Sequence, residues 1–182
     1  MRNYIIKRLL LIPLTLFIGV YYLNGKKYYF SKVNYKKLTG WKRVDDKVWY
    51  FGTDGVLRRL SGIRKTSDGL SYYFDPTTGE MTTGWIHYGV NDYYFSPKTG
   101  RMLTGWQTID KKKYYFSKDG AMQTGWQLVG GNWFYMEGSG AMATGWRQTA
   151  PGQWYYLNAN GAMAASTVID GYTLDASGLW VS

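Results

Sequence analysis

The chain has 182 residues and no cysteine, which excludes disulfides, thiolate metal sites and a cysteine nucleophile. With 18 Tyr and 9 Trp, many aromatic rings must lie at a surface or groove, because their polar tips need partners or water. The net charge of +10 comes from residues 1–65, with 15 basic and 3 acidic residues, since residues 66–182 carry 7 basic and 9 acidic ones. This basic third indicates either a positively flanked membrane segment or attraction to an anionic surface, and it lacks nucleic-acid-binding motifs.

The first 23 residues predict a leader for export. Arg2, Lys7 and Arg8 precede an uncharged apolar run over 9–23, and this order is the layout of a signal peptide. The run of 15 residues is short for a spanning helix, which needs roughly 17–25, so a cleaved signal peptide and a retained signal anchor both stay open. The other interpretation is a strand of the first repeat, because 21–25 already resemble repeat sequence.

Three motifs recur in phase along the rest of the chain, which indicates a repeat architecture. Thr-Gly-Trp contributes Trp41, Trp85, Trp106, Trp126 and Trp146, of which the last four are 21, 20 and 20 residues apart. Aromatic triplets occupy 28–30, 49–51, 72–74, 93–95, 114–116, 133–135 and 154–156. Gly-x-Met contributes Met81, Met102, Met122, Met142 and Met163.

Each unit of about 20 residues predicts one β-hairpin. Gly-Trp opens the first strand, a turn rich in Gly, Asn and Asp follows, and the aromatic triplet forms the return strand. A lone hairpin is marginal in water, so stacked hairpins must bury a shared face. We therefore expect an all-β hairpin solenoid behind the short hydrophobic segment 1–23. It comprises one repeat domain over 24–182, with divergent repeats in 24–84, regular repeats in 85–165 and a C-terminal cap in 166–182.

The sequence does not indicate an enzyme. His87 is the only histidine, and without a cysteine or a second histidine it predicts no metal site. The acidic residues mostly stand in turn sequences such as Asp54-Gly55 and Asp119-Gly120, where turn chemistry explains them. No pair of carboxylates is placed as a glycosidase requires. We expect no catalytic residue, no metal and no cofactor.

The three motifs resemble the bacterial choline-binding or cell-wall-binding repeat family over about 38–182. The match is strongest in 104–165, where Thr-Gly-Trp-Gln, the triplet and Gly-Ala-Met stand in register. Related repeats occur in streptococcal glucan-binding proteins and in large clostridial toxins. The resemblance implies that choline lies between consecutive hairpins, in a cage of the Gly-Trp tryptophan, a second Trp on the return strand, an aromatic ring of the following repeat and a Met. Aromatic faces suit a quaternary ammonium, which cannot donate a hydrogen bond.

Mapped onto this chain, the resemblance assigns two full sites. The first comprises Trp126, Trp133 and Tyr156, with Met142 nearby. The second comprises Trp146, Trp154 and Tyr172, with Met163 nearby. The weaker candidates, in repeats that lack the second Trp, are Trp85, Trp106, Tyr115, Tyr135 and Met122. Strand alternation places Tyr155 on the face opposite Trp154 and Tyr156, so we expect Tyr155, with Phe134 and Tyr114, in the core and Trp180 in the cap.

These observations predict a secreted bacterial protein of the cell surface or cell wall, with residues 9–23 as a possible membrane tether. Its expected partner is choline or phosphocholine on teichoic and lipoteichoic acids, and no nucleic acid. The alternative is a module for α-glucans or host glycans, because aromatic faces also stack on sugar rings. The string 108–116, which contains Lys113, resembles the glucan-binding and toxin repeats more than the choline type. A third possibility is a structural spacer with empty clefts.

Overall fold

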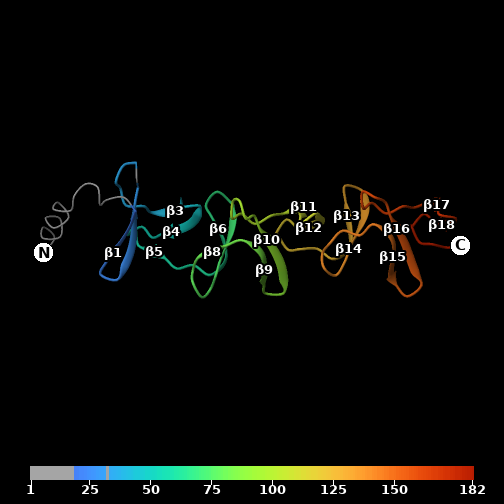
Figure 1. Cartoon of the computed structure of the whole chain (residues 1–182), viewed down its shortest axis with the longest axis horizontal. Helices are drawn as coiled ribbons and strands as arrows, with labels where there is room; N and C mark the ends of the chain where they lie inside the picture. Colours follow the sequence, from blue (N-terminus) through green and yellow to red (C-terminus); the bar gives the residue numbers. More distant parts are fainter. Residues whose placement is uncertain (1–18, 32) are drawn as a thin grey trace, which may run out of the picture. The chain divides into compact units, whose positions relative to one another are not determined.

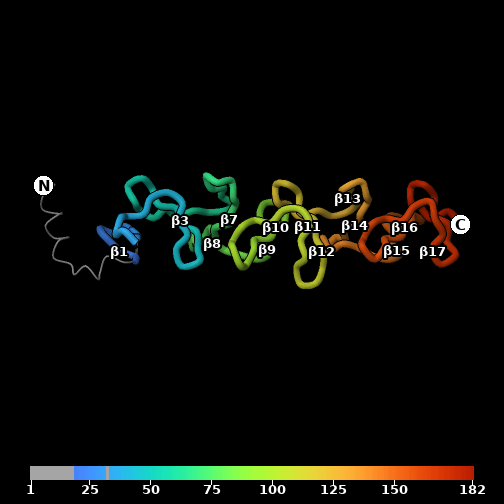
Figure 2. Tube along the Cα trace, turned by 90° about the horizontal axis from the view of Figure 1, so that it is seen from above, coloured from blue at the N-terminus to red at the C-terminus, as the bar shows by residue number. Residues whose placement is uncertain are grey.

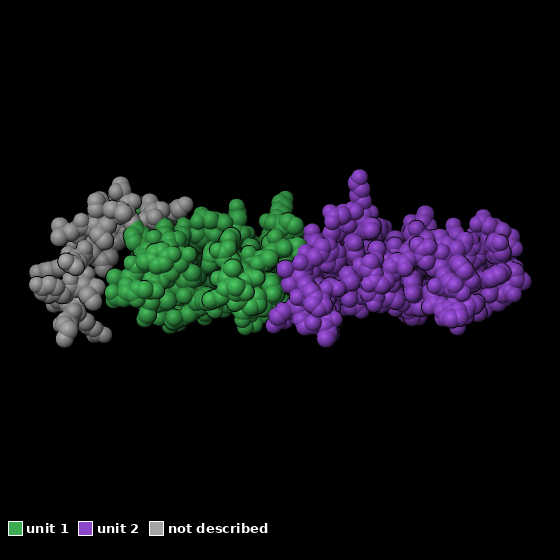
Figure 3. All heavy atoms as spheres, turned by 60° about the horizontal axis from the view of Figure 1, so that its bottom comes forward, with its two compact units in different colours: residues 1–84, 95–102 green, residues 85–94, 103–182 purple. Residues whose placement is uncertain are grey.

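The computed structural model describes residues 19–31 and 33–182, and in these residues it is all-β, built from short antiparallel hairpins (Figure 1). The chain divides into two compact units (Figure 3). Unit 1 comprises the described residues up to Gly84 together with Phe95–Met102, and unit 2 comprises Trp85–Tyr94 and Leu103–Ser182. None of the residues that the structure describes belongs to a helix able to cross a membrane.

The strands of unit 1 form one two-stranded sheet, β1-β2, and two three-stranded sheets, β3-β4-β5 and β6-β7-β8. Their bounds are β1 (Gly19–Leu23), β2 (Lys26–Phe30), β3 (Gly40–Val44), β4 (Lys47–Phe51), β5 (Leu57–Arg58), β6 (Gly62–Lys65), β7 (Ser71–Phe74) and β8 (Met81–Thr82). The next hairpin, β9 (Gly84–Tyr88) and β10 (Asn91–Phe95), gives residues to both units.

The remaining strands of unit 2 pair two by two, and Figure 2 shows these hairpins following one another along the chain. Their bounds are β11 (Gly105–Ile109), β12 (Lys112–Phe116), β13 (Gly125–Val129), β14 (Asn132–Met136), β15 (Gly145–Ala150), β16 (Gln153–Leu157), β17 (Thr167–Ile169) and β18 (Tyr172–Leu174). The expected all-β hairpin architecture is confirmed.

The hairpin turns explain the register of the strands. In the turn between β11 and β12, Asp110 and Lys111 both have positive φ, at 49° and 65°. Gly130 and Gly131 do the same between β13 and β14, at 58° and 80°. Two consecutive residues with positive φ are typical of the type I′ turn, whose twist matches that of paired strands. The two-residue turn thus fixes which side chains share a face.

The backbone conformation at the start of each Gly-Trp strand favours glycine. Gly125 and Gly145 have φ of 69° and 74°, a region that residues with a Cβ seldom adopt. In the predicted cap, Ser166 replaces this glycine and still adopts φ of 51°. The last hairpin therefore keeps the conformation of the repeat although its sequence has diverged.

A buried side chain lies opposite that position in every hairpin from β3-β4 onward, whereas Phe30 of the first hairpin is only partly buried. Gly125 pairs with Met136 and Gly145 with Leu157, and both of these partners have no exposed surface. The equivalent residues of the other hairpins are Phe51, Phe74, Phe95, Phe116 and Leu174, all at most 3% exposed. This column is the core of the repeats, and burying one such side chain contributes about 1.5–3 kcal/mol.

Contacts between neighbouring repeats come from Gly-x-Met. The N–H of Met142 donates to the carbonyl oxygen of Lys113 at 2.8 Å, and that of Met163 donates to Trp133 at 2.8 Å. The Met142 side chain also lies over Gly161, where an added Cβ would be 2.3 Å from its Sδ. These Gly-x-Met segments are thereby hydrogen-bonded to a return strand one repeat earlier than the hairpin that they directly follow.

The predicted leader falls mostly outside the described residues. Its last five residues, 19–23, form β1 and pair with β2, with Tyr21 opposite Tyr28. The structure therefore places repeat material before residue 24, in line with the alternative interpretation of this segment. The identity of the leader stays a prediction.

Candidate functional site: aromatic clefts between hairpins

Each cleft is built from four positions that recur in every repeat. The first is the Trp of Gly-Trp, and the second is the second residue of the return strand, which lies on the same face. The third lies on the next hairpin's return strand, two residues before the side chain that ends this strand, as Tyr155 precedes Leu157 and Tyr172 precedes Leu174. The fourth is the last residue of the Gly-x-Met segment that follows this next hairpin. Side chains alternate along a strand, so one hairpin supplies one face and its neighbour supplies the opposite face.

In the cleft of Trp126 three rings surround the first position. Trp133 lies edge-on at 6.3 Å between ring centroids, and Tyr135, across the same hairpin, lies at 5.2 Å. Tyr155 of the next hairpin lies at 4.9 Å with an interplanar angle of 73°. Trp133 is 43% exposed and Trp126 is partly buried, so solvent reaches the Trp133 side of this cleft.

The cleft of Trp146 is an open cavity of about 320 Å³, lined by Trp146, Trp154, Tyr172 and Trp180. Tyr172 lies 5.4 Å from Trp146 and 5.5 Å from Trp180, in both cases edge to face. The N–H of Trp180 donates to the carbonyl oxygen of Trp154 at 2.9 Å, as Met163 does to Trp133. Trp180 therefore takes the fourth position here.

Three expected members of these sites are wrong, namely Tyr156, Met142 and Met163. Tyr156 does not join Trp126; it lies 5.3 Å from Trp146 of its own hairpin, and Tyr155 takes the predicted place. Side chains do alternate along the return strand as expected, but the face that the next hairpin turns toward Trp126 is the one with Tyr155 and not the one with Tyr156. Met142 also belongs elsewhere, because its backbone bond ties it to Lys113 and its side chain lines the cleft of Trp106.

The same one-repeat shift applies to Met163. Met163 was expected beside Trp146, but its backbone is bonded to Trp133, so it belongs to the cleft of Trp126. Met122 is bonded to the carbonyl oxygen of Asp92 and so belongs to the cleft of Trp85. Trp180 was expected in the cap, and its place in a cleft was not predicted from the sequence. Its signal is Gly178-Leu179-Trp180, which repeats the Gly-x-Met pattern with Trp in place of Met.

The cleft of Trp85 has two rings and a carboxylate. Trp85 lies 5.1 Å from Tyr94 and 5.0 Å from Tyr114. Its second position is Asp92, whose Oδ1 is 2.8 Å from Nδ1 of His87. Tyr114 is thus a cleft residue and not the core residue that we expected.

The cleft of Trp106 has Phe134 at the third position, with ring centroids 4.9 Å apart. Tyr115 lies at 5.0 Å across the same hairpin. The weaker candidate Tyr135 is absent from this cavity's lining and packs on Trp126 instead. Phe134, like Tyr155, lies against the Trp of the preceding hairpin, so its expected role in the core was wrong.

In unit 1 the cleft of Trp41 is filled. Val48 at its second position is 5% exposed and joins Tyr72 and Phe74 in a hydrophobic cluster against which Trp41 and Met81 pack. Trp41 lies 6.0 Å from Phe74. Apolar packing has replaced the open ring faces found in unit 2.

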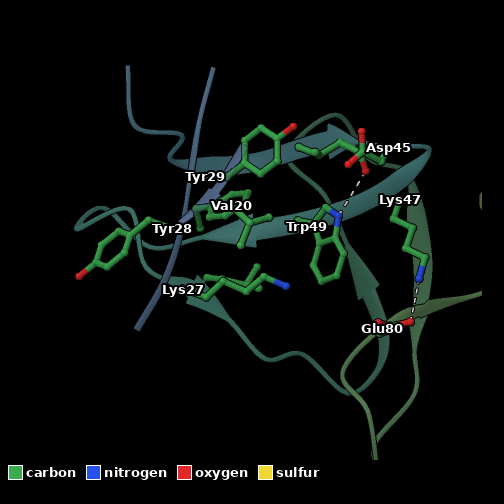
Figure 4. A pocket seen from close by; sticks show the side chains of 11 residues that line it. Val20, Lys27, Tyr28, Tyr29, Asp45, Lys47, Trp49 and Glu80 are labelled. Atoms are coloured by element: carbon green, nitrogen blue, oxygen red, sulfur yellow. Dashed lines mark hydrogen bonds and ion pairs between the residues drawn. The ribbon is translucent and has the colours of Figure 1, made fainter. Parts of the chain in front are cut away.

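The cleft between the first hairpin, β1-β2, and the sheet β3-β4-β5 has other side chains at the four positions (Figure 4). These are Val20, Lys27, Trp49 and Leu57, which line a cavity of about 280 Å³. The Nζ of Lys27 lies 5.3 Å from the centroid of the Trp49 ring, within the range of a cation–π interaction. The chain's own ammonium group therefore occupies the face of this indole.

Charged side chains also line the same cavity. Lys47 Nζ and Glu80 Oε2 form an ion pair at 2.7 Å (Figure 4). The hydrogen bond from Lys47, together with its charge, lowers the pKa of Glu80 below its ordinary value. The Trp49 indole N–H donates to the backbone oxygen of Val44 at 3.3 Å.

The other carboxylates with perturbed pKa are turn residues. In each, the pKa lies below its ordinary value mainly because a neighbouring N–H or O–H group donates a hydrogen bond to the carboxylate. These residues are Asp54, Asp68, Asp75 and Asp175. Their hydrogen bonds stabilise the turns, and the described residues contain no cluster of side chains suited to a metal ion.

Hairpins that hold aromatic clefts between them define a repeat protein built for binding. The choline-binding repeat model matches residues 38–84, 60–104, 103–144 and 124–167, and the chain belongs to this family of binding modules. No curated protein sequence matches the chain.

Solved structures agree with this assignment. Choline binding protein F of Streptococcus pneumoniae is 36% identical with a TM-score of 0.72, over 91% of this chain and 57% of that one. CbpJ of Streptococcus pneumoniae TIGR4 is 36% identical with a TM-score of 0.73, over 90% and 58%. The choline-binding domain of CbpL from Streptococcus pneumoniae is 27% identical with a TM-score of 0.69, over 90% and 86%. The chain thus spans less than two thirds of the first two proteins.

Proposed function

We propose that this chain is a non-catalytic attachment protein of the bacterial cell surface, which holds the choline groups of teichoic and lipoteichoic acids in the clefts of Trp126 and Trp146. The observation that carries the proposal is the cavity of about 320 Å³ whose lining is four aromatic side chains. A trimethylammonium group offers no hydrogen-bond donor, and aromatic faces attract it by about 0.5–2 kcal/mol each.

Charge supports the assignment of choline to these two clefts. Their second positions are Trp133 and Trp154, whereas the clefts of Trp106 and of the first hairpin carry Lys113 and Lys27 there. A lysine repels a cationic ligand, but an indole attracts it. Among the similar structures, choline binding protein F has been solved in complex with ipratropium and in the presence of a peptidoglycan analogue.

Attachment would depend on several weak contacts. One cleft with millimolar affinity contributes about −4 kcal/mol, which is too little to hold a protein on a wall. Two clefts on one chain, meeting a polymer that carries many cholines, raise the effective affinity by about 10²–10⁴. The basic residues of the first 65 positions add attraction for the polymer's phosphates.

Isothermal titration calorimetry with choline tests the proposal. We expect binding in the millimolar range, with the same chain retained on a resin that bears quaternary or tertiary amines and eluted by choline. Absence of heat up to high millimolar choline would sink the proposal. Retention on dextran that choline cannot reverse would favour the carbohydrate alternative instead.

A further inference from the structure

The cleft of Trp106 differs from its neighbours in the polar groups that line it. Its cavity measures about 220 Å³. The ring of Trp106 and the edge of Phe134 form an apolar wall, with an interplanar angle of 69°. The other lining residues are Met142 and the polar Gln107, Thr108, Lys113 and Asn160. One aromatic wall opposite several polar groups is unlike the four-ring cavity of Trp146.

Lys113 takes the second position of this cleft, where Trp133 and Trp154 stand in the next two repeats. No carboxylate forms an ion pair with Lys113 in the part of the chain that the structure describes. The first hairpin of unit 1 shows what a lysine does at this position, since Lys27 extends its ammonium over the third-position ring of Trp49 (Figure 4). A lysine here projects into its cleft and makes it cationic.

The polar groups retain free hydrogen-bonding capacity toward the cleft. Gln107 uses its Nε2 to donate to the carbonyl oxygen of Thr104 at 2.7 Å, which leaves its Oε1 as an acceptor. The Oδ1 of Asn160 accepts from the N–H of Ala162 at 3.0 Å, which leaves its amide N–H groups as donors. Thr108 adds a hydroxyl that both donates and accepts. Donors and acceptors beside an aromatic face match a ring of hydroxyl groups.

We propose that the cleft of Trp106 binds a sugar ring that carries an anionic group. The apolar face of the sugar would stack on Trp106, its hydroxyls would meet Gln107, Thr108 and Asn160, and its phosphate or carboxylate would pair with Lys113. Choline is the wrong ligand here because its ammonium and that of Lys113 would repel each other. The inference goes beyond choline binding and does not depend on it.

Nuclear magnetic resonance of the ¹⁵N-labelled full chain tests this inference through the indole N–H signals of its tryptophans, with Trp106→Phe to assign one of them. The probes are glucose 6-phosphate, glucuronate, glucose, inorganic phosphate and choline. We expect the Trp106 signal to shift with the two anionic sugars at millimolar concentration, and glucose or inorganic phosphate alone to bind about tenfold more weakly. A response to glucose 6-phosphate only, or to glucuronate only, identifies which anion the cleft takes.

Lys113 provides the decisive variants. Lys113→Gln should weaken binding of the anionic sugar about tenfold, to the level of glucose, and Lys113→Arg should retain it. The inference is overturned if Lys113→Gln binds like the wild type, if inorganic phosphate binds as well as the sugar phosphate, or if choline shifts the Trp106 signal at lower concentration. The choline responses of Trp126 and Trp146 appear in the same spectra, so failure of either proposal is recognised separately.

Discussion

The hairpins of unit 1 and unit 2 have the same backbone, but different side chains occupy the positions that form the clefts. In unit 1, Val48 and Met81 fill the space beside Trp41, and Lys27 covers the ring face of Trp49. In unit 2, the corresponding positions of the last two clefts carry aromatic rings that stay open to solvent. The repeat is therefore a scaffold in which two or three positions determine whether a cleft is filled, cationic or lined by rings.

The strand pairing also varies from hairpin to hairpin. Leu57–Arg58 and Met81–Thr82, both in unit 1, add third strands, β5 and β8, to their hairpins. The equivalent residues of the other hairpins form isolated bridges, such as Phe30 with Lys37 in unit 1 and Met136 with Met142 in unit 2. The scaffold thus accommodates local changes in hydrogen bonding, while a residue with positive φ still precedes the hairpins, Ser166 taking the place of glycine before the last one.

The largest effect should come from that buried column and should be alike in both units. Leu157→Ala in unit 2 and Phe51→Ala in unit 1 should each lower the free energy of unfolding by about 2–5 kcal/mol, because both side chains are at most 3% exposed. Denaturant unfolding followed by circular dichroism measures this loss. A loss of unfolding free energy below 1 kcal/mol in either unit would contradict the same core role for these residues in both units. Val168→Ala, at a 59% exposed position, is the control.

The next effect should separate the two units. Trp133→Ala and Trp154→Ala each remove one ring face and should weaken choline binding at their own cleft by about tenfold, with little loss of stability at these solvent-facing positions. Trp49→Ala, in the cleft that Lys27 occupies, is the matched control and should leave choline affinity unchanged. Calorimetry at a fixed protein concentration measures all three. Equal losses of choline affinity for Trp49→Ala and Trp154→Ala would contradict the proposed difference in choline binding between the clefts of unit 1 and unit 2.

Much of this architecture is predictable from the sequence because the turns are short and specific. The Gly, Asn and Asp turn residues, the alternating strands and the phased motifs predict the hairpins and both tryptophan pairs. The sequence did not reveal which face a hairpin presents to its neighbour, since that depends on the path of the linking segment. This is why Tyr156 was chosen over Tyr155, and why Met142 and Met163 were each assigned to a cleft one repeat later in the chain than the one to which they belong. Trp180 was assigned only to the cap because it replaces a methionine.

A smaller effect should distinguish the regular hairpins from the last one. Gly145→Ala places a Cβ at φ of 74° and should cost about 1–2 kcal/mol, although no atom lies within 4 Å of that Cβ. Ser166→Gly, at φ of 51° in the last hairpin, should instead stabilise the chain by up to about 1 kcal/mol. Opposite signs in thermal unfolding are the expected result. The same sign for both would show that contacts, and not backbone conformation, decide this position.

The smallest effect should be a pH dependence of choline binding in the cleft of Trp146, which the last hairpin closes. The pKa of Asp175 lies below its ordinary value of 3.8, first because the Ser177 hydroxyl donates to it and then because the N–H of Leu179 does. Its carboxylate therefore stabilises the 175–179 turn above pH 3.8, and this contribution disappears as the pH falls through the lowered pKa. The turn leads directly to Trp180, so choline binding at Trp146 should weaken in acid before the hairpins unfold.

Asp175→Asn should remove that acid sensitivity, because asparagine does not titrate. Choline titrations followed by tryptophan fluorescence at pH 6 and pH 3 measure the difference, with Trp154→Ala as the background in which the Trp126 cleft is the tighter of the two. Since Trp126 is closed by Met163 and not by the last hairpin, its affinity should change less between the two pH values. An equal acid response of both clefts, unaltered by Asp175→Asn, would show that the 175–179 turn does not position Trp180.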